Sequence, residues 1–393
     1  MADHLDYQQN QPMHSLHNYC NRCDRRHSDL AQQKGYRFMK AGRTLQELAI
    51  ELSRQQGAKK DMMVDTGALR MDASESGILL NVTGNGTASQ YGINEIAHRQ
   101  IGQHLKIPAV YYDRMRSEYP DLLAQNVNGW FGRTPDTKRM LRTMDGTARA
   151  LLSDRYRRID NFEIANAVLP IIGRMEGAKV ESCELTDSRM YLKVVNPRIT
   201  AEVQKGDIVQ AGVIISNSEV DMGSVSVSPL IYRLVCLNGM IAQDGAVRKY
   251  HVGRANTSGE DFSIYRDETI EADDKAFLMK LEDSAKAAVD QARFASIVDK
   301  MREAVEVKMQ AKLVPQVVEL ASKEYSFSES EGQGILGHLI EGGDLSLYGL
   351  ANAVTRQAQD VESYDRSTEL EAAGYKILTM APALWRALNR ERR

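Results

Sequence analysis

The stretch that decides the fold is residues 213–240, where VIISNSE (213–219) leads through a serine and valine alternation into LIYRLVCLNGM (230–240). In the run from Ser224 to Ser228, every second residue is valine, which is the two-residue period of a strand with one buried face. The β-branched and aromatic residues on both sides of it favour further strands. We therefore expect strands over roughly residues 178–252, ending at Val247–Val252.

Before this region, the chain alternates short strands with amphipathic helices. Thr44 can cap a helix in which Leu45, Leu48, Ala49 and Leu52 recur at helical spacing. Short strands are expected at 62–64 and 78–82, divided by glycine-rich turns. Residues 92–118 are expected to be helical, with an interruption near Pro108, because proline favours the start of a helix.

Residues 138–152 carry a clear hairpin signal. Asp145 and Gly146 separate two alternating runs, and an Asp-Gly pair favours a type I′ turn, in which both central residues take positive φ. After this hairpin, Asn161 can cap a helix from Phe162 to about Met175, with inward-facing Ile164, Val168, Ile171 and Ile172.

The second half of the chain is predicted to be mainly helical. From Glu268 to about Ala321 small and apolar residues recur in steps of three and four, which indicates a coiled-coil-like hairpin or bundle that Pro315 kinks or divides. The members of this seam are Leu278, Leu281, Ala285, Ala288, Ala292 and Ala295. A last helical unit contains residues 350–355 and ends in a basic tail over 386–393.

These patterns predict an α+β fold with a central twisted, mostly antiparallel sheet, a β-hairpin and packed helices, followed by a long helical segment. The expected parts are a polar and basic N-terminal arm (1–43), an α+β core with the basic hairpin (44–265), a long helical hairpin or bundle element (266–325) and a C-terminal helical unit with a basic tail (326–393). No internal repeat is evident.

Composition bounds the class of protein. The 393 residues are 42% hydrophobic and 26% charged, with a net charge of −3, so any nucleic-acid interaction has to be local. The sequence contains no apolar run long enough to span a bilayer and no apolar stretch of a signal peptide near its start. Four cysteines in this length suit a reducing compartment, so we expect a cytoplasmic protein with no membrane partner.

Several segments together resemble a family of phage- and plasmid-like proteins grouped as domain of unknown function 932. The matching segments are LSDRYRRIDN (152–161), ISNSE (215–219), YRLVCLNGM (232–240), HVGR (251–254) and NAVT (352–355). The resemblance covers roughly residues 60–380 and implies a mobile-element origin, the cytoplasm of a bacterial host cell and an α+β core, without assigning catalytic residues. It departs at Glu219–Asp221, where such proteins often carry a glycine. In outline, the layout is also similar to Rad52-like single-strand annealing proteins, a likeness of fold alone.

The hairpin and its continuation are rich in basic residues. From Arg133 to Arg158 the sequence contains eight basic and three acidic residues. If the strand runs unbroken, Arg149, Arg155 and Arg157 share one face. Such a stripe suits a phosphate backbone, and Tyr156 or Trp130 could stack on a base. The alternative is a solvated sheet face. The candidate DNA contacts here are Lys138, Arg139, Arg142, Arg149, Arg155, Tyr156, Arg157 and Arg158.

Two further groups of cations extend this candidate set. Arg233 lies in an otherwise apolar strand, so it needs a buried partner, for which a carboxylate is favoured over a phosphate. A second basic cluster suits DNA or equally an edge strand protected by charge. Its members are Arg248, Lys249, His251 and Arg254.

A zinc site is a further alternative. Cys20, Cys23 and His27, with His17 or His14, have the ligand types of a tetrahedral site, but no second ligand pair follows an intervening loop. We therefore expect no cofactor, with zinc in this segment as the alternative. No nucleophile elbow surrounds the serines, and no Walker lysine follows Gly84–Gly86, so enzymatic activity is not expected.

The function predicted from the sequence is sequence-independent binding of single-stranded DNA, extending to strand annealing in phage or prophage recombination. In this hypothesis the helix over 278–309 joins subunits of a homo-oligomer. The alternative is a non-enzymatic anti-defence or regulatory protein that binds a host protein. A metal-dependent nuclease is less favoured, because no compact carboxylate constellation is evident.

Overall fold

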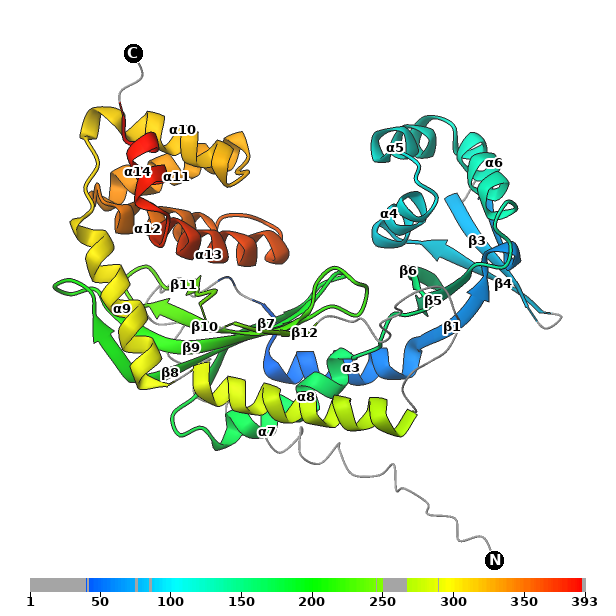
Figure 1. The fold of residues 1–393 in the computed structure, drawn as a ribbon, viewed down its shortest axis with the longest axis horizontal. Helices are drawn as coiled ribbons and strands as arrows, with labels where there is room; N and C mark the ends of the chain where they lie inside the picture. The colour runs from blue at the N-terminus through cyan, green and yellow to red at the C-terminus, as the bar shows by residue number, and fades with distance from the viewer. Residues whose placement is uncertain are drawn as a thin grey trace, which may run out of the picture.

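The computed structural model describes residues 40, 42–74, 77–84, 87–244, 246–249, 267–288 and 290–390. Two six-stranded sheets follow one another along the molecule, each with its own helices (Figure 1). The predicted α+β class with mostly antiparallel pairing is confirmed. The expected central sheet is a pair of sheets, since the strands before and after α7 (Asn161–Arg174) pair only among themselves.

The first sheet has the strand order β1-β5-β6-β4-β3-β2 and is antiparallel except between β4 and β6. Its strands are β1 (Lys59–Asp65), β2 (Leu69–Ser74), β3 (Gly77–Gly84), β4 (Thr87–Ile93), β5 (Lys138–Met144) and β6 (Thr147–Ser153). Three helices, α4 (Glu95–His104), α5 (Ala109–Glu118) and α6 (Pro120–Phe131), cover one face and share its core. As predicted, the helical stretch is interrupted at Pro108, which precedes α5.

The predicted hairpin is confirmed as β5 and β6. Asp145 and Gly146 have φ values of 50° and 74°, so both occupy the left-handed region that a type I′ turn requires. The register then shifts between Arg142 and Thr143, because Arg142 pairs with Ala150 while Thr143 pairs with Ala148. Arg149 is therefore the extra residue of a β-bulge, a feature that redirects a side chain.

The second sheet has the order β11-β10-β9-β8-β7, with β12 also paired to β10. Its strands are β7 (Lys179–Leu185), β8 (Met190–Glu202), β9 (Ile208–Asn217), β10 (Val225–Arg233), β11 (Asn238–Ile241) and β12 (Val247–Lys249). Along β8, Met190, Leu192 and Val194 belong to one core, while Tyr191 and Val195 belong to another. Both faces are thus covered, which explains the apolar character of the segment around 213–240.

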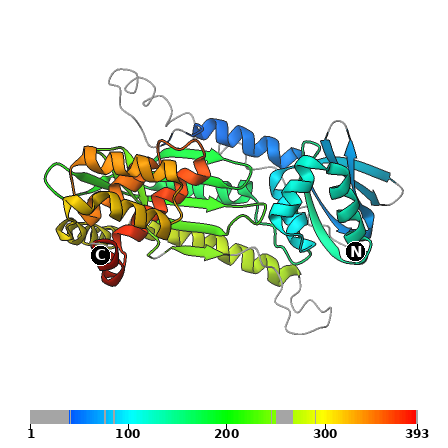
Figure 2. The same cartoon turned by 90° about the horizontal axis from the view of Figure 1, so that it is seen from above.

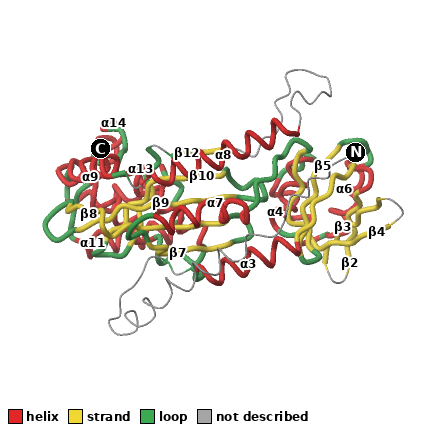
Figure 3. The backbone as a smooth tube through the Cα atoms, turned by 90° about the horizontal axis from the view of Figure 1, so that it is seen from below, coloured by secondary structure: helices red, strands yellow, loops and turns green. Residues whose placement is uncertain are grey.

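Helices α3 (Leu45–Ala58), α7 and α8 (Asp267–Ala288) pack on one face of this sheet (Figure 3). Thr44 caps α3 with a capping box, as predicted. The predicted Asn161 cap of α7 is wrong by one residue: Asp160 is the cap and forms a capping box with Glu163, because its carboxylate accepts from the N3 backbone.

The C-terminal helices reach the opposite face of the second sheet, where Tyr364 packs with Tyr191 and Leu230, and the first of these helices passes the end of the sheet (Figure 1 and Figure 2). They are α9 (Gln291–Glu306), α10 (Val314–Glu324), α11 (Glu329–Gly342), α12 (Leu347–Gln357), α13 (Tyr364–Leu378) and α14 (Pro382–Leu388). In the described part of the chain, no helix is both long and apolar enough to cross a membrane.

The predicted seam over residues 278–309 does not form one helical face. Asp290 caps α9, so α8 and α9 are separate helices. Leu281 of α8 packs on the second sheet, whereas Ala292 and Ala295 of α9 are exposed. Phe294 and Val298 supply the buried face of α9 instead. Of the residues expected to join subunits, Leu281 and Ala285 are therefore buried within the chain.

Candidate functional site

A cluster of buried charges lies where the two sheets meet. The first sheet supplies Lys59, Asp61, Arg142 and Arg149, the N-cap of α7 supplies Asp160, and the connection from β9 to β10 supplies Glu219. Their side chains are 0% to 16% exposed. Buried ions are stable only where their charges and hydrogen bonds are matched, so the partners of each one decide what it can do.

Arg142 is fully buried, and this cluster satisfies its guanidinium. Its Nε and Nη2 donate to the two oxygens of Asp61, each at 2.9 Å. Nη2 also donates to Asp160 at 2.7 Å, and Nη1 donates to the Glu219 carbonyl at 2.8 Å. Burial opposes the charge of Arg142, but these carboxylates outweigh it and raise the Arg142 pKa. Arg142 is therefore a structural cation, and the expected phosphate contact does not agree with its position.

Asp160 and Glu219 both pair with cations of this cluster. Burial favours neutral Asp160, but the charges of Arg142 and Lys59 outweigh burial and lower the pKa of Asp160. Glu219 accepts from Lys59 Nζ at 2.9 Å and from the Asn161 backbone N–H at 2.7 Å. Its other oxygen lies 2.7 Å from Arg149 Nη1.

Arg149 differs from Arg142 because only one side of its guanidinium is used. The bulge in β6 directs Nη1 to Glu219. Nε and Nη2 are buried and have no hydrogen-bond partner among the described residues. These two groups form the side-on edge of the guanidinium, the edge that binds two oxygens of a carboxylate or phosphate in parallel.

Arg149 lines a pocket of about 380 Å³ that includes residues of both sheets and of α3. Four arginines line it, namely Arg43, Arg54, Arg149 and Arg189. Four carboxylates do so as well, namely Glu51, Asp145, Asp187 and Glu219. The lining is therefore balanced in formal charge, and what favours an anion here is the unpaired edge of Arg149 rather than net charge. The opposite wall contributes Arg189, whose Nε donates to the Met222 carbonyl at 2.8 Å.

Tyr156 does not present a stacking surface, contrary to the prediction. The side chain is 7% exposed, and its hydroxyl donates to the Ser218 carbonyl at 3.1 Å. Tyr156 packs with Leu152 and Val220 in the small apolar core between the sheets. Trp130, the other aromatic residue considered, is 47% exposed, and the Arg133 guanidinium lies 5.7 Å from its ring centroid.

The other predicted contacts near the hairpin do not form one stripe, because β6 ends at Ser153 and the chain turns. Lys138 and Arg155 are exposed, and Arg158 is 57% exposed with Asp61 at 3.4 Å. Arg157 forms an ion pair with Asp273 of α8 at 2.8 Å. Arg139 contacts His104.

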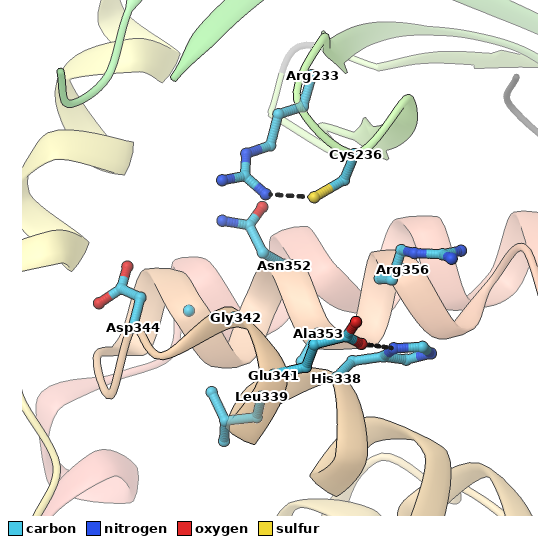
Figure 4. Close-up of a pocket in the computed structure, with 11 residues that line it drawn as sticks. Arg233, Cys236, His338, Leu339, Glu341, Gly342, Asp344, Asn352, Ala353 and Arg356 are labelled. Carbon is cyan, nitrogen blue, oxygen red and sulfur yellow. Dashed lines mark hydrogen bonds and ion pairs between the residues drawn. The ribbon is translucent and has the colours of Figure 1, made fainter. Parts of the chain in front are cut away.

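Arg233 has the carboxylate partner that was favoured from the sequence. Its Nε and Nη2 donate to the two oxygens of Asp207, each at 2.7 Å, and Nη1 lies 3.1 Å from the Cys236 sulfur. It lines a second pocket, of about 270 Å³, between the end of β10 and helices α11 and α12 (Figure 4). Because Asp207 occupies the side-on edge of Arg233, this pocket lacks the unpaired donors of Arg149.

The remaining predicted residues lie mostly beyond what the structure describes. Arg248 is exposed on β12, and Lys249 follows it in the strand. His251, Arg254 and the possible zinc ligands His14, His17, Cys20, Cys23 and His27 lie outside the described residues. Within the described ranges, no group of three or more histidine, cysteine or acidic side chains could hold a metal ion.

Lys59, Asp61 and Asp160 were not predicted as site residues. One signal was available for Arg142, the partner of Asp61 and Asp160: it lies between Leu141 and Thr143 in a strand whose neighbours are apolar. The reasoning applied to Arg233, that a cation in an apolar strand needs a buried carboxylate, applies equally to Arg142. It does not say which carboxylate.

Comparison with known proteins gives one match. The family model described as "Domain of unknown function (DUF932)" matches residues 149–378. The matched range begins at Arg149 and includes Asp160, Glu219 and the pocket residues 185–189 at the end of β7 and in the turn after it, whereas Lys59, Asp61 and Arg142 precede it. No curated protein and no solved structure matches the chain.

Proposed function

The chain belongs to the DUF932 family, and from the side chains inside and beside the matched range we propose that it binds single-stranded DNA by its phosphate groups, independently of base sequence. The observation that carries this proposal is the unpaired, buried side-on edge of Arg149, a residue that lines the pocket between the sheets. A phosphate offers two oxygens at the spacing of this edge.

A single strand suits this site better than a duplex. Nε and Nη2 of Arg149 are unpaired but buried, so a phosphate has to enter the pocket and displace the atoms that cover them. A flexible strand can turn a phosphate inward, whereas a duplex holds its phosphates on a stiff cylinder. At the rim of the pocket, Arg43 and Arg54 are 40% and 47% exposed and pair with Glu184 and Glu51, so a neighbouring phosphate has to compete with these carboxylates.

The expected contacts are therefore fewer than the stripe predicted from the sequence. Arg142 and Tyr156 support the site from within, while Arg149 and the rim arginines face the ligand. With few phosphates neutralised, we expect a shallow salt dependence, because its slope follows the number of phosphate contacts. Strand annealing is a narrower form of the same proposal and would require two strands held at once.

The test is fluorescence anisotropy of a labelled, unstructured oligonucleotide at two salt concentrations, with a duplex of equal length as the control. Arg149→Lys keeps a charge beside Glu219 but removes the paired donors, and it should weaken binding about tenfold, which corresponds to about 1.4 kcal/mol. Arg70→Lys on β2, whose side chain is 73% exposed, is the matched control and should change nothing. Absence of binding at both salt concentrations, or an Arg149→Lys protein that binds normally, would overturn the proposal.

A protein partner is the second candidate, and one observation favours it. Helices α5 and α6 and the residue that joins them expose five large apolar or aromatic side chains: Val110, Tyr111, Tyr119, Leu122 and Trp130. Exposed apolar residues gathered on one pair of helices are typical of protein contacts. This candidate becomes the leading one if the oligonucleotide shows no binding.

A further inference from the structure

We infer that the outer edge of β1 joins two copies of this chain, so that their first sheets continue into one antiparallel sheet across a two-fold axis at Met62. β1 follows directly on α3 at the border of the first sheet, and β5 is its one partner among the described strands (Figure 1). Met63, in the middle of this strand, is 50% exposed. No residue of β1 lines the pocket at Arg149, so this inference goes beyond the proposed function and is independent of it.

Every second residue of β1 directs its backbone groups away from β5. In an antiparallel pair, residues that exchange N–H···O=C bonds with the neighbouring strand alternate with residues that do not. The Lys60 carbonyl points toward β5, because it accepts from the Thr143 hydroxyl at 3.1 Å. Six residues on, the Thr66 N–H also donates to the chain that enters β5. The alternation therefore turns the N–H and C=O groups of Asp61 and Met63 outward, where they have no hydrogen-bond partner among the described residues.

The other border strands of the two sheets are short or are bound by other groups. At β2, the Asn128 side chain accepts from the Met71 N–H at 2.7 Å and donates to the Met71 carbonyl at 2.8 Å. At β7, the Arg43 N–H donates to the Cys183 carbonyl at 2.7 Å. β11 and β12 contain four and three residues. Among the strands that the structure describes, β1 with its seven residues thus offers the longest border for pairing with another chain.

The order of charges in β1 favours a second copy as the partner. The strand reads KKDMMVD, with two lysines at one end and Asp65 at the other. When two copies run antiparallel about Met62, Asp65 of each copy lies opposite Lys59 of the other. Asp61 then lies opposite Met63, so the outward groups of these two residues exchange hydrogen bonds across the axis. Moving the axis by one residue puts Asp61 opposite itself or opposite Asp65, and like charges in opposite positions destabilise strand pairing.

Cysteine substitution tests the register. Met62 lies on the axis, where opposite residues that exchange no hydrogen bonds have Cα atoms about 4.5 Å apart, a separation that a disulfide spans. We expect oxidised glutathione to link most of the Met62→Cys protein into a covalent dimer on a non-reducing gel. Lys60→Cys is the matched control, because its two cysteines are offset by about 13 Å along the strands. It should form no more dimer than the parent protein, which has cysteines of its own.

Proline substitution tests the backbone pairing. Met63→Pro removes the outward N–H but leaves the bonds to β5, since proline is tolerated on an edge strand where its nitrogen faces away from the sheet. Each dimer loses this hydrogen bond twice, so we expect the dimer Kd to rise at least about tenfold, which corresponds to about 1.4 kcal/mol. Sedimentation across a dilution series measures the Kd, and circular dichroism with the urea midpoint checks that the variant is folded.

The results that would overturn the inference are separate from those that bear on DNA. A parent protein that stays monomeric at every concentration overturns it. A dimer in which Met62→Cys forms no link, or in which Lys60→Cys links equally well, assigns the contact to another surface and also overturns it. If Met63→Pro does not fold, the two cysteine variants decide alone. Neither measurement includes an oligonucleotide, so failure of the proposed function leaves this inference standing.

Discussion

His98 is a buried titratable residue in the first half of the molecule. It is 6% exposed, and its Nδ1 lies 2.9 Å from the Tyr112 hydroxyl. Burial lowers its pKa to about 4, and the nearby Arg116 acts in the same direction, while Glu95 and Asp113 oppose the shift. The imidazole is therefore neutral in the folded protein at pH values where an unfolded chain, with its ordinary pKa near 6.5, takes up a proton.

This shift predicts an acid-sensitive first sheet. Between about pH 6.5 and pH 4 the unfolded state binds the additional proton, so stability should fall as the pH falls, by at most about 3 kcal/mol from His98. Urea unfolding at pH 7.5 and pH 4.5 measures the change. His98→Asn keeps an acceptor or donor near Tyr112 and should show a smaller loss. An equal loss in both proteins would mean that other groups, such as His104, whose pKa is also lowered to about 4, account for it.

The β5–β6 hairpin holds Arg149, with its unpaired Nε and Nη2, at a defined position. Its turn depends on positive φ at Asp145 and Gly146. The bulge follows soon after the turn, because Arg149 is the third residue of β6. A turn of another type would change the register of the strand and therefore the direction of Arg149.

Gly146→Ala should destabilise the protein by about 1 to 2 kcal/mol, because an alanine side chain strains a left-handed residue. The φ of Gly146 is 74°, and a Cβ there meets no other atom within 4 Å, so the backbone is the sole cause. Gly57→Ala in α3 also has open space and no positive φ, so it should stabilise by about 0.4 to 1 kcal/mol. Urea midpoints of the two variants are compared; a shift of the same sign in both would contradict this reading.

At the scale of the whole molecule, the two halves, each a sheet with its helices, are joined more by polar contacts than by apolar ones. The apolar core between the sheets contains five buried residues, namely Ile96, Ala150, Leu152, Tyr156 and Val220. Across the same junction run the ion pairs of Lys59, Arg142 and Arg149 with Asp160 and Glu219. The halves are thus coupled by groups whose loss leaves uncompensated charge.

Glu219→Gln should weaken this coupling, because Lys59 and Arg149 lose a shared carboxylate; breaking a buried pair typically costs about 3 to 5 kcal/mol. The chain has two tryptophans, Trp130 in α6 and Trp385 in α14. A Trp385→Phe background therefore reports unfolding of the first half through Trp130, and a Trp130→Phe background reports the second half through Trp385. The two urea transitions should coincide in the parent proteins and separate in Glu219→Gln, with the Trp130 signal changing first. Glu118→Gln, in an exposed pair with Arg114, is the control; transitions that remain together in Glu219→Gln would show that apolar contacts suffice.

Several elements were predictable from the sequence because their causes are local. The Asp145–Gly146 turn, the Thr44 cap and the start of α5 after Pro108 each depend on the dihedral or hydrogen-bonding preferences of one or two residues. The helical seam was predicted wrongly because a spacing of three and four residues indicates which side of a helix is apolar, but not what that side packs against. The faces of α8 and α9 pack on different cores within the chain.

The amino-acid sequence by itself thus determined the α+β class, the hairpin and the need of isolated cations for buried partners. The tertiary structure decided which arginine is structural and which faces a pocket. Arg142 meets Asp61 from 81 residues earlier and the Glu219 carbonyl from 77 residues later, and the bulge at Arg149 follows from strand pairing. Hydrogen bonds between distant segments depend on sheet order and register, which no local preference specifies, so the chemistry of the site becomes visible only in the folded molecule.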